Sequence, residues 1–250
     1  MDLGLSGKGV IVTGGTRGIG LAIARACLAE GAKVSICGRT QDSLDAALAE
    51  LSGDAPADHV QGAICDVGDA EALAAYVEAA AGKLGGLFAL VNNPSGFGAT
   101  DDEDGWKKGI DVDLMGVVRA TWAAAPHLEK TGGSVLNISS ISGIGPSSSI
   151  PYGAVKAAVI QLTQSHAVRY APQRIRVNCI APGSIEFPGG SWEWRRYNDP
   201  SKYFATRDKI PFGRMGTPDE VARVAAFLVS EAAGWVTGQT VSVDGGQNFG

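Results

Sequence analysis

Short apolar segments recur along this chain, and each is followed by a stretch long enough to form a helix. The segments are almost continuously apolar, as expected for β-strands that are covered on both faces. Strands that alternate with helices form parallel sheets through right-handed crossovers. We therefore predict one α/β domain over residues 1–250, with a doubly wound seven-stranded parallel sheet and helices on both faces. The predicted strands span residues 9–13, 33–37, 59–65, 87–91, 134–138, 176–180 and 240–243.

The first predicted strand is joined to a helix by a glycine-rich turn with the sequence TGGTRGIG, residues 13–20. We expect Gly14 to allow a sharp exit from the strand, Gly18 to let a pyrophosphate approach the backbone, and Gly20 to let the helix pack closely on the sheet. The alternative is a tight strand-to-helix connection that binds nothing. The turn lacks the terminal Lys-Ser/Thr of a P-loop, which argues against hydrolysis of a nucleoside triphosphate.

A second pattern downstream can move a proton. Tyr152 and Lys156 are four residues apart, so in a helix their side chains lie on one face and the ammonium can approach the phenol. A free tyrosine is a poor proton shuttle near neutrality, whereas a nearby cation stabilises its phenolate. Such a spacing alone also occurs in ordinary surface pairs. Here Ser140 ends the predicted strand just upstream, where open α/β sheets bind their ligands.

Composition narrows the function classes. The 250 residues carry a formal charge of −5 and 19% charged residues, which gives no support to binding of nucleic acid or of a membrane surface. The first residues have no basic flank followed by an apolar segment, so we expect a cytoplasmic protein. The histidines show no metal-binding spacing, and we expect no metal site. The cysteines are widely spaced and are expected to be reduced thiols of the core; they are Cys27, Cys37, Cys65 and Cys179.

Taken in order, these motifs resemble those of the short-chain dehydrogenase/reductase (SDR) family, Rossmann-fold oxidoreductases with a Ser-Tyr-Lys centre. The resemblance extends over essentially the whole chain. The matching segments are the turn at residues 13–20, Asp66-Val67, Asn92-Asn93-Pro94-Ser95-Gly96, the residues Ser140, Tyr152 and Lys156, Pro182-Gly183, and Val243-Asp244-Gly245-Gly246.

The resemblance implies a role for each site residue. Ser140 holds the substrate oxygen, Tyr152 gives or takes its proton, and Lys156 binds the nicotinamide ribose and stabilises the tyrosinate. The cofactor carries the hydride. The residues implied in cofactor binding are Gly14, Arg17, Gly18, Ile19, Gly20, Arg39, Asp66, Val67, Asn92, Tyr152, Lys156, Gly183 and Ile185.

The end of the second predicted strand bears on which dinucleotide binds. An acidic residue there would bind the ribose 2′-hydroxyl of NAD and would repel the 2′-phosphate of NADP. By resemblance, Gly38 stands where NAD-preferring members carry the acid, and Arg17 and Arg39 stand where many NADP-preferring members carry bases. Arginine suits phosphate through its forked donors, although both residues could also be ordinary solvated arginines. We predict that NADP(H) is favoured over NAD(H).

The chain departs from the family pattern at three places. Asp113 stands where the family usually has an asparagine whose main-chain carbonyl helps to anchor a water-mediated proton relay. We place Asp113 among the candidate catalytic residues, since an ionised carboxylate there could also act on Lys156. Pro94-Ser95 alters the loop near the pyrophosphate, and Phe187 replaces a threonine that contacts the cofactor in many relatives.

By resemblance, residues 186–210 correspond to a mobile lid over the active site. This segment is rich in aromatic side chains, which favour an apolar or ring-bearing substrate if they enclose the pocket. They could equally pack the lid down or face another subunit. They are Phe187, Trp192, Trp194, Tyr197, Tyr203 and Phe204.

We therefore expect an NADP(H)-dependent oxidoreductase, of the carbonyl reductase or alcohol dehydrogenase type, that acts on a small or medium hydrophobic carbonyl or alcohol. The alternative is a non-catalytic protein of the same fold that binds or senses a dinucleotide. We also expect a homotetramer, with a dimer as second choice, because the predicted helices 103–128 and 151–170 and the terminal segment 237–250 carry more apolar surface than one sheet face requires. Examples are Trp122, Ala123, Ala124, Val159, Val241, Val243 and Phe249.

Overall fold

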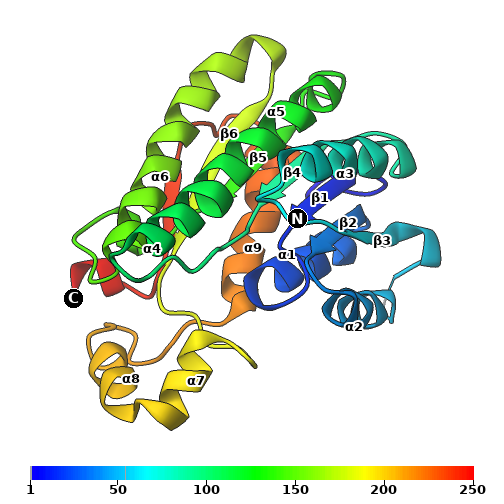
Figure 1. Ribbon diagram of the computed structural model, residues 1–250. Coiled ribbons are helices and arrows are strands. Elements are labelled where there is room, and N and C mark those ends of the chain that lie inside the picture. Colours follow the sequence, from blue (N-terminus) through cyan, green and yellow to red (C-terminus); the bar gives the residue numbers. More distant parts are fainter. Residues whose placement is uncertain (1, 54) are drawn as a thin grey trace.

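All seven predicted strands form, and they join in one parallel sheet with the order β3-β2-β1-β4-β5-β6-β7 (Figure 1). The computed structural model describes residues 2–53 and 55–250. The chain first builds outward from β1 to β3 and then returns to the other side of β1 with β4, so the order of the strands switches between β1 and β4. The strands are β1 (Gly9–Thr13), β2 (Lys33–Gly38), β3 (Val60–Ile64), β4 (Ala89–Asn92), β5 (Ser134–Ile138), β6 (Arg176–Pro182) and β7 (Thr240–Val243).

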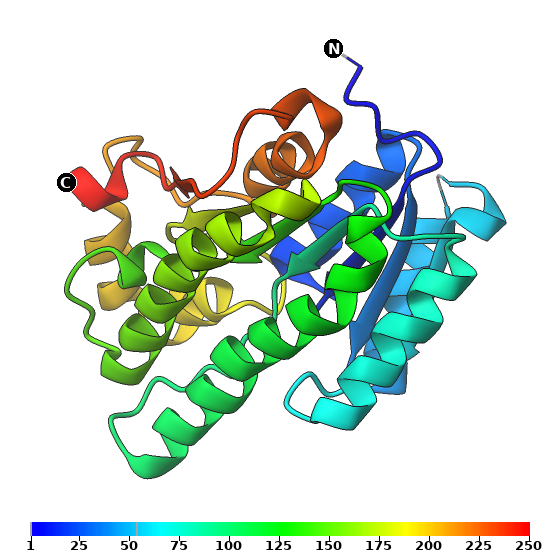
Figure 2. The same cartoon turned by 90° about the horizontal axis from the view of Figure 1, so that it is seen from above.

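Helices cover both faces of the sheet, as Figure 2 shows from above. Helices α1, α2 and α9 lie on one face, and α3, α5 and α6 lie on the other. The α-helices are α1 (Gly18–Ala29), α2 (Gln41–Ser52), α3 (Ala70–Lys83), α4 (Glu103–Lys108), α5 (Gly116–Glu129), α6 (Ile150–Tyr170), α7 (Ser191–Asn198), α8 (Pro200–Arg207) and α9 (Pro218–Val229). Short 3-10 turns span Ala57–His59, Ile141–Gly143, Ala171–Gln173, Glu231–Ala233 and Gln247–Phe249.

Strand β1 shows why the predicted strands are apolar along their whole length. Successive side chains of a strand point to opposite faces of the sheet. Val10 and Val12 pack with α1, α2 and α9, whereas Ile11 between them packs with the helices of the other face. All three are fully buried. The structure therefore confirms a doubly wound α/β fold with a core on each side of the sheet.

The two edge strands differ from this pattern. The side chains of β3 are half-buried or exposed, and Ile64 at its end is 47% exposed. The side chains of β7 are also only partly covered. The expectation that all strands are covered on both faces is therefore wrong for β3 and β7, because side chains of both strands pack against the core on the α1, α2 and α9 face, whereas the core described on the other face contains none of them.

The predicted helix over residues 103–128 contains a π-helical segment. Asp102 caps its start by accepting a hydrogen bond from the Gly105 backbone N–H at 2.7 Å. Helix α4 then passes into a π-helix at Gly109–Met115, which continues as α5. A π-helix places extra residues in each turn and often occurs at functional sites. Asp113 lies inside this segment.

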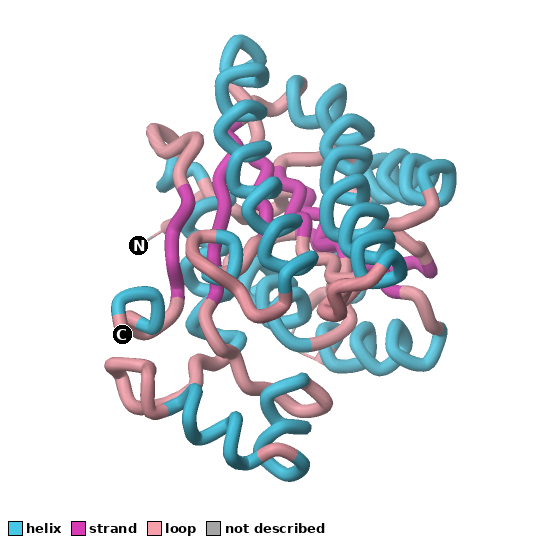
Figure 3. Tube along the Cα trace, turned by 60° about the vertical axis from the view of Figure 1, so that its left-hand side comes forward, coloured by secondary structure: helices cyan, strands magenta, loops and turns pink. Residues whose placement is uncertain are grey.

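Residues 186–210 contain α7 and α8, which lie apart from the sheet in a separate small layer (Figure 3). This layer has a small apolar centre formed by Tyr203, Ile210 and Met215, with Trp192 packed against it. Over residues 2–53 and 55–250, no helix is both long and apolar enough to span a bilayer.

Candidate functional site

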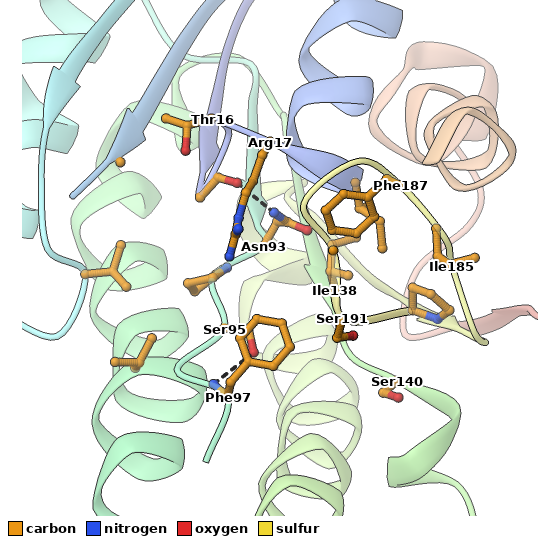
Figure 4. A pocket seen from close by; sticks show the side chains of 18 of the residues that line it. Thr16, Arg17, Asn93, Ser95, Phe97, Ile138, Ser140, Ile185, Phe187 and Ser191 are labelled. Atoms are coloured by element: carbon orange, nitrogen blue, oxygen red, sulfur yellow. Dashed lines mark hydrogen bonds between the residues drawn. The ribbon is translucent and has the colours of Figure 1, made fainter. Parts of the chain in front are cut away.

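A cavity of about 300 Å³ lies at the carboxyl ends of the central strands, next to the switch between β1 and β4. This is where doubly wound sheets bind their ligands. Its walls come from the glycine turn, from the segments that follow β2, β3, β4, β5 and β6, and from the first part of the lid segment. Figure 4 shows how side chains from these segments converge on it.

Ser140, Tyr152 and Lys156 all line this cavity. Ser140 follows β5 and starts a 3-10 turn, where its Oγ accepts a hydrogen bond from the Ser142 backbone N–H at 3.1 Å. Tyr152 and Lys156 lie on α6, and Lys156 Nζ is 5.6 Å from the centre of the Tyr152 ring. The structure thus brings the predicted hydroxyl, phenol and ammonium together in one place.

Lys156 is almost completely buried, with 2% exposure, and two groups contact its ammonium. Its Nζ donates a hydrogen bond to the Ile138 carbonyl at 3.2 Å and lies 3.0 Å from Asp113 Oδ1. Burial opposes the charged form of Lys156, but the Asp113 carboxylate, with a smaller contribution from Tyr152, raises the pKa of the lysine. Lys156 is therefore a fixed ammonium at neutral pH.

One carboxylate oxygen of Asp113 contacts Lys156, and the other accepts a hydrogen bond from the backbone of Gly96. Its side chain is buried, and Oδ2 accepts a hydrogen bond from the Gly96 backbone N–H at 2.6 Å. The contact of Oδ1 with Lys156 is an ion pair rather than an aligned hydrogen bond. The carboxylate does not line the cavity itself, so it acts on the site through Lys156 and Gly96.

The glycine turn has the geometry that a pyrophosphate needs. Gly14 and Gly18 have φ values of 62° and 55°, in the left-handed region that favours glycine. A Cβ on Gly20 would lie 2.3 Å from the Gly14 carbonyl oxygen, so only glycine lets α1 begin this close to the strand. Arg17 reaches across the cavity and donates a hydrogen bond to the Gly189 carbonyl of the lid segment at 3.4 Å. The turn therefore fits a dinucleotide.

Two arginines line the end of the cavity that is far from Ser140 and Tyr152, next to the end of β2. Strand β2 ends in a glycine there and not in an acidic residue. Arg17 and Arg39 both line it. Gly38 ends β2, and a Cβ there would lie 2.4 Å from Thr16 Cγ2. The Thr16 side chain thus occupies the space into which an acidic side chain at residue 38 would extend. Asp66 and Val67, after β3, line the same end.

Three of the residues predicted to bind cofactor do not line the cavity. The Phe187 ring covers Gly18, where the sequence predicted the approach of a pyrophosphate, and Gly20 packs against the Gly14 carbonyl. Asn92 is buried in the sheet, where its Nδ2 donates a hydrogen bond to Asn137 Oδ1 at 2.9 Å. The next residue, Asn93, lines the cavity instead, and its Nδ2 donates to the Gly14 carbonyl at 2.9 Å. The remaining predicted residues line the cavity: Gly14, Arg17, Ile19, Arg39, Asp66, Val67, Tyr152, Lys156, Gly183 and Ile185.

Comparisons with known proteins agree with this geometry. A family profile described as enoyl-(acyl carrier protein) reductase matches residues 14–248. The human protein named dehydrogenase/reductase SDR family member 4 is 38% identical over 249 residues, which cover 97% of this chain and 88% of that protein. This chain belongs to the short-chain dehydrogenase/reductase family. It is therefore an oxidoreductase that binds a nicotinamide dinucleotide and acts on a small molecule.

Solved structures of other SDR proteins resemble the whole chain. An NADPH-bound short-chain oxidoreductase from Pseudomonas aeruginosa PAO1, described as containing an atypical catalytic center, superposes with a TM-score of 0.88 at 33% identity and 97% coverage of both chains. L-Sorbose reductase from Gluconobacter frateurii, complexed with NADPH and L-sorbose, gives a TM-score of 0.89 at 31% identity, with 99% of this chain and 98% of that chain covered.

Within this SDR enzyme, the aromatic residues of the lid segment divide into three groups. Phe187 and Trp192 line the cavity, and Phe187 lies against Gly18, where a Cβ would meet its ring at 2.6 Å. Tyr203 is buried, and its hydroxyl donates to Glu186 Oε2 at 2.7 Å, so it packs the segment down. The others, Trp194, Tyr197 and Phe204, are exposed. Of the uses considered from the sequence, lining the pocket and packing the segment down both occur, and a contact with another subunit stays a prediction.

Sequence reasoning missed Phe97, which lines the cavity beside Ser95 (Figure 4). Its φ is 49°, in the left-handed region that a bulky residue rarely adopts. Its position between Gly96 and Gly98 was the available signal, because flanking glycines allow the close approaches that such a turn needs.

Proposed function

We propose that this SDR enzyme interconverts a ketone or aldehyde and an alcohol, with NADP(H) as cofactor. The observation that carries the proposal is that Ser140, Tyr152 and Lys156 line the same cavity as the glycine turn. A dinucleotide held by the turn and a carbonyl held by the hydroxyls would therefore lie side by side. Placing two reactants in contact is itself a large part of catalysis.

Each side chain then has a definite task. Bound NADP(H) supplies or accepts the hydride at the carbonyl carbon. The Ser140 hydroxyl donates a hydrogen bond to the substrate oxygen and orients it. In reduction, Tyr152 Oη gives its proton to that oxygen as it becomes an alcohol, and in oxidation it takes the proton back. The buried Lys156 ammonium stabilises the resulting phenolate and binds the nicotinamide ribose.

The preference for NADP(H) rests on charge and space at the far end of the cavity. Arg17 and Arg39 can bind a 2′-phosphate. An acidic residue at position 38 would repel that phosphate, but position 38 is glycine and the Thr16 side chain fills the space next to it. The structures of the Pseudomonas oxidoreductase and of L-sorbose reductase contain NADPH. This similarity supports the assignment.

Two alternatives are weaker. Reduction of an enoyl group is suggested by the description of the family profile, but the four-residue spacing of Tyr152 and Lys156 resembles that of carbonyl-reducing members. A non-catalytic dinucleotide-binding protein would not need a tyrosine paired with a buried ammonium.

The apolar side chains of Phe187 and Trp192 favour a hydrophobic substrate of small or medium size.

We also propose a homotetramer, with a dimer as second choice. Trp122 on α5 and Phe249 near the carboxyl terminus are large apolar side chains that are exposed. Ala124 and Val159, which the sequence also suggested as interface residues, are fully buried within the subunit and support no interface. Sedimentation at micromolar concentration tests this, and a fully active species of 25.6 kDa would exclude an obligatory oligomer.

The cytoplasmic location expected from the sequence stays a prediction.

A screen of cofactor oxidation tests the proposed reaction. Purified protein is incubated with NADPH or NADH and with ketoacyl, steroid, terpenoid, sugar and aromatic carbonyls, and loss of reduced cofactor is followed by absorbance. We expect turnover of at least one carbonyl class, faster with NADPH. Turnover of enoyl compounds alone, or faster turnover with NADH, would contradict the proposal.

A further inference from the structure

The segment from Gly96 to Gly98 is pressed against the α4 and π-helical segments at both of its glycines. A Cβ on Gly96 would lie 2.7 Å from the Lys108 carbonyl oxygen, and one on Gly98 would lie 2.1 Å from the Gly105 carbonyl oxygen. Neither position has room for a side chain. The only side chain between them is that of Phe97, and it must turn away from the helix.

Phe97 turns toward the cavity. Its φ of 49° is unfavourable for a bulky residue, and such conformations persist only where the surroundings fix them. Its ring lines the cavity, and the residue is 58% exposed. Figure 4 shows the ring beside Ser95, among the other side chains that line the pocket. An exposed aromatic ring held in an unfavourable conformation inside a ligand site points to a contact with the ligand.

The loop that carries Phe97 is bound to Lys156 through one carboxylate. Asp113 Oδ2 accepts from the backbone N–H of Gly96, the residue before Phe97, at 2.6 Å. Asp113 Oδ1 lies 3.0 Å from Lys156 Nζ. The side chains of Asp113 and Lys156 are buried, and the contact with Gly96 is partly buried.

We propose that Phe97 contacts a flat, ring-bearing part of the carbonyl substrate, and that Asp113 is a positioning residue that fixes both Lys156 and the loop carrying Phe97. This inference rests on the proposed function and names the substrate class of the same site. Trp192 lines the same cavity from the lid segment, so a ring entering it meets aromatic side chains from two separate segments. Aromatic groups favour such surroundings over water.

A binding measurement tests the role of Phe97 without depending on turnover. Phenylpropanedione, which carries a ring, and butanedione, which does not, are titrated into the complex of the protein with NADP⁺, and binding is followed by saturation-transfer NMR. We expect Phe97→Ala to weaken phenylpropanedione by about fivefold to tenfold, the size of an aromatic contact, and butanedione by less than about twofold. Trp235→Ala, which removes an exposed ring that does not line the cavity, should change neither.

The role of Asp113 is tested by two variants that differ in what they retain. Asp113→Asn keeps an oxygen that can accept from Gly96 but loses the charge facing Lys156, so turnover should fall while phenylpropanedione affinity stays within about twofold. Asp113→Ala loses both, so the affinity should fall as in Phe97→Ala, and the Asp113→Ala/Phe97→Ala double variant should lose no more. Asp111→Asn, which removes an exposed carboxylate of the same π-helix, is the control.

The outcomes separate this inference from the proposed function. If wild-type protein does not bind phenylpropanedione, or if Phe97→Ala weakens both diones equally, the contact of Phe97 with a ring is wrong. If the losses in the double variant add, Asp113 does not position Phe97. If the binding pattern is as expected but no carbonyl class in the cofactor-oxidation screen is reduced, the contact of Phe97 with a ring stands and the proposed carbonyl reduction is contradicted.

Discussion

Lys156 Nζ and Asp113 Oδ1 lie 3.0 Å apart, and both side chains are almost completely buried. A charged group loses its hydration when it is buried. The opposite charge of the partner offsets this loss, so either group alone would destabilise the fold. Their contact fixes the ammonium at the position from which it can act on Tyr152. It also makes the π-helical segment part of the site.

The ion pair predicts a loss of stability in Asp113→Asn. Leaving the Lys156 ammonium without its partner should lower the free energy of unfolding by about 3 kcal/mol, the size found when one member of a buried pair is removed. Urea denaturation at pH 7 measures the change. The control Asp111→Asn, whose carboxylate pairs with Lys107 at the surface, should lower it by less than about 1 kcal/mol. Equal losses in the two variants would show that the buried pair does not stabilise the fold.

The same pair predicts how this difference depends on pH. The groups that face the Lys156 ammonium are Asp113, Tyr152 and Cys179 of β6. The pKa of Lys156 is raised in the folded protein, so the pair contributes fully below the pKa of an unfolded lysine, about 10.4, and its contribution is lost as pH rises through the folded value. The difference between wild type and Asp113→Asn should therefore be constant from about pH 7 to about pH 10 and shrink above the unfolded lysine pKa of about 10.4. Denaturation curves at each pH test this, and a difference that vanished by pH 8 would contradict it.

The arginines at the far end of the cavity predict a cofactor-specific effect. Arg17→Ala combined with Arg39→Ala should weaken NADPH by about tenfold or more and NADH by less than about threefold, because only NADPH has the 2′-phosphate that their guanidinium groups can bind. Direct fluorescence titration of both cofactors measures this. Arg25→Ala, which removes an arginine of α1 paired with Glu50 outside the cavity, is the matched control. Equal weakening of the two cofactors would contradict the assignment of NADP(H).

The contact between Thr16 and Gly38 predicts a pair of substitutions that act together. Gly38→Asp alone should bind both cofactors poorly, because its Cβ would lie 2.4 Å from Thr16 Cγ2. Adding Thr16→Ala should make room for the carboxylate, which then binds the ribose hydroxyls of NADH and repels the phosphate of NADPH. Titrations should show that the double variant prefers NADH. If Gly38→Asp alone already prefers NADH, Thr16 does not restrict this position.

The sequence predicts those parts of the site that follow from regular geometry. The four-residue spacing of Tyr152 and Lys156 fixes their common face once α6 forms, and the end of β5 brings Ser140 to the edge of the sheet where ligands bind. Asn92 and Asn93 show where this reasoning stops. The two residues are adjacent and chemically identical, but β4 ends at Asn92, whose buried side chain bonds Asn137 of β5 and Thr121 of α5, and Asn93 reaches the cavity.

The remaining parts depend on irregular backbone. The helical period of 3.6 residues does not reveal the π-helical segment that places Asp113 beside Lys156. The left-handed conformation of Phe97 is typical of glycine or asparagine, so its residue type gives no hint of it. Phe187 is recognisable as a departure from the family, but its position against Gly18 results from the path of the lid segment.

The turnover of Tyr152→Phe tests whether Tyr152 gives the proton to the substrate oxygen. The variant keeps the ring and its neighbour Lys156 but loses the hydroxyl that gives or takes the proton. On a carbonyl that wild-type protein reduces with NADPH, we expect turnover to fall by about 100-fold or more, with NADPH affinity and the unfolding midpoint nearly unchanged. Tyr197→Phe, in the exposed part of the lid segment, should keep full activity. A Tyr152→Phe enzyme with wild-type turnover would show that Tyr152 is not the proton donor.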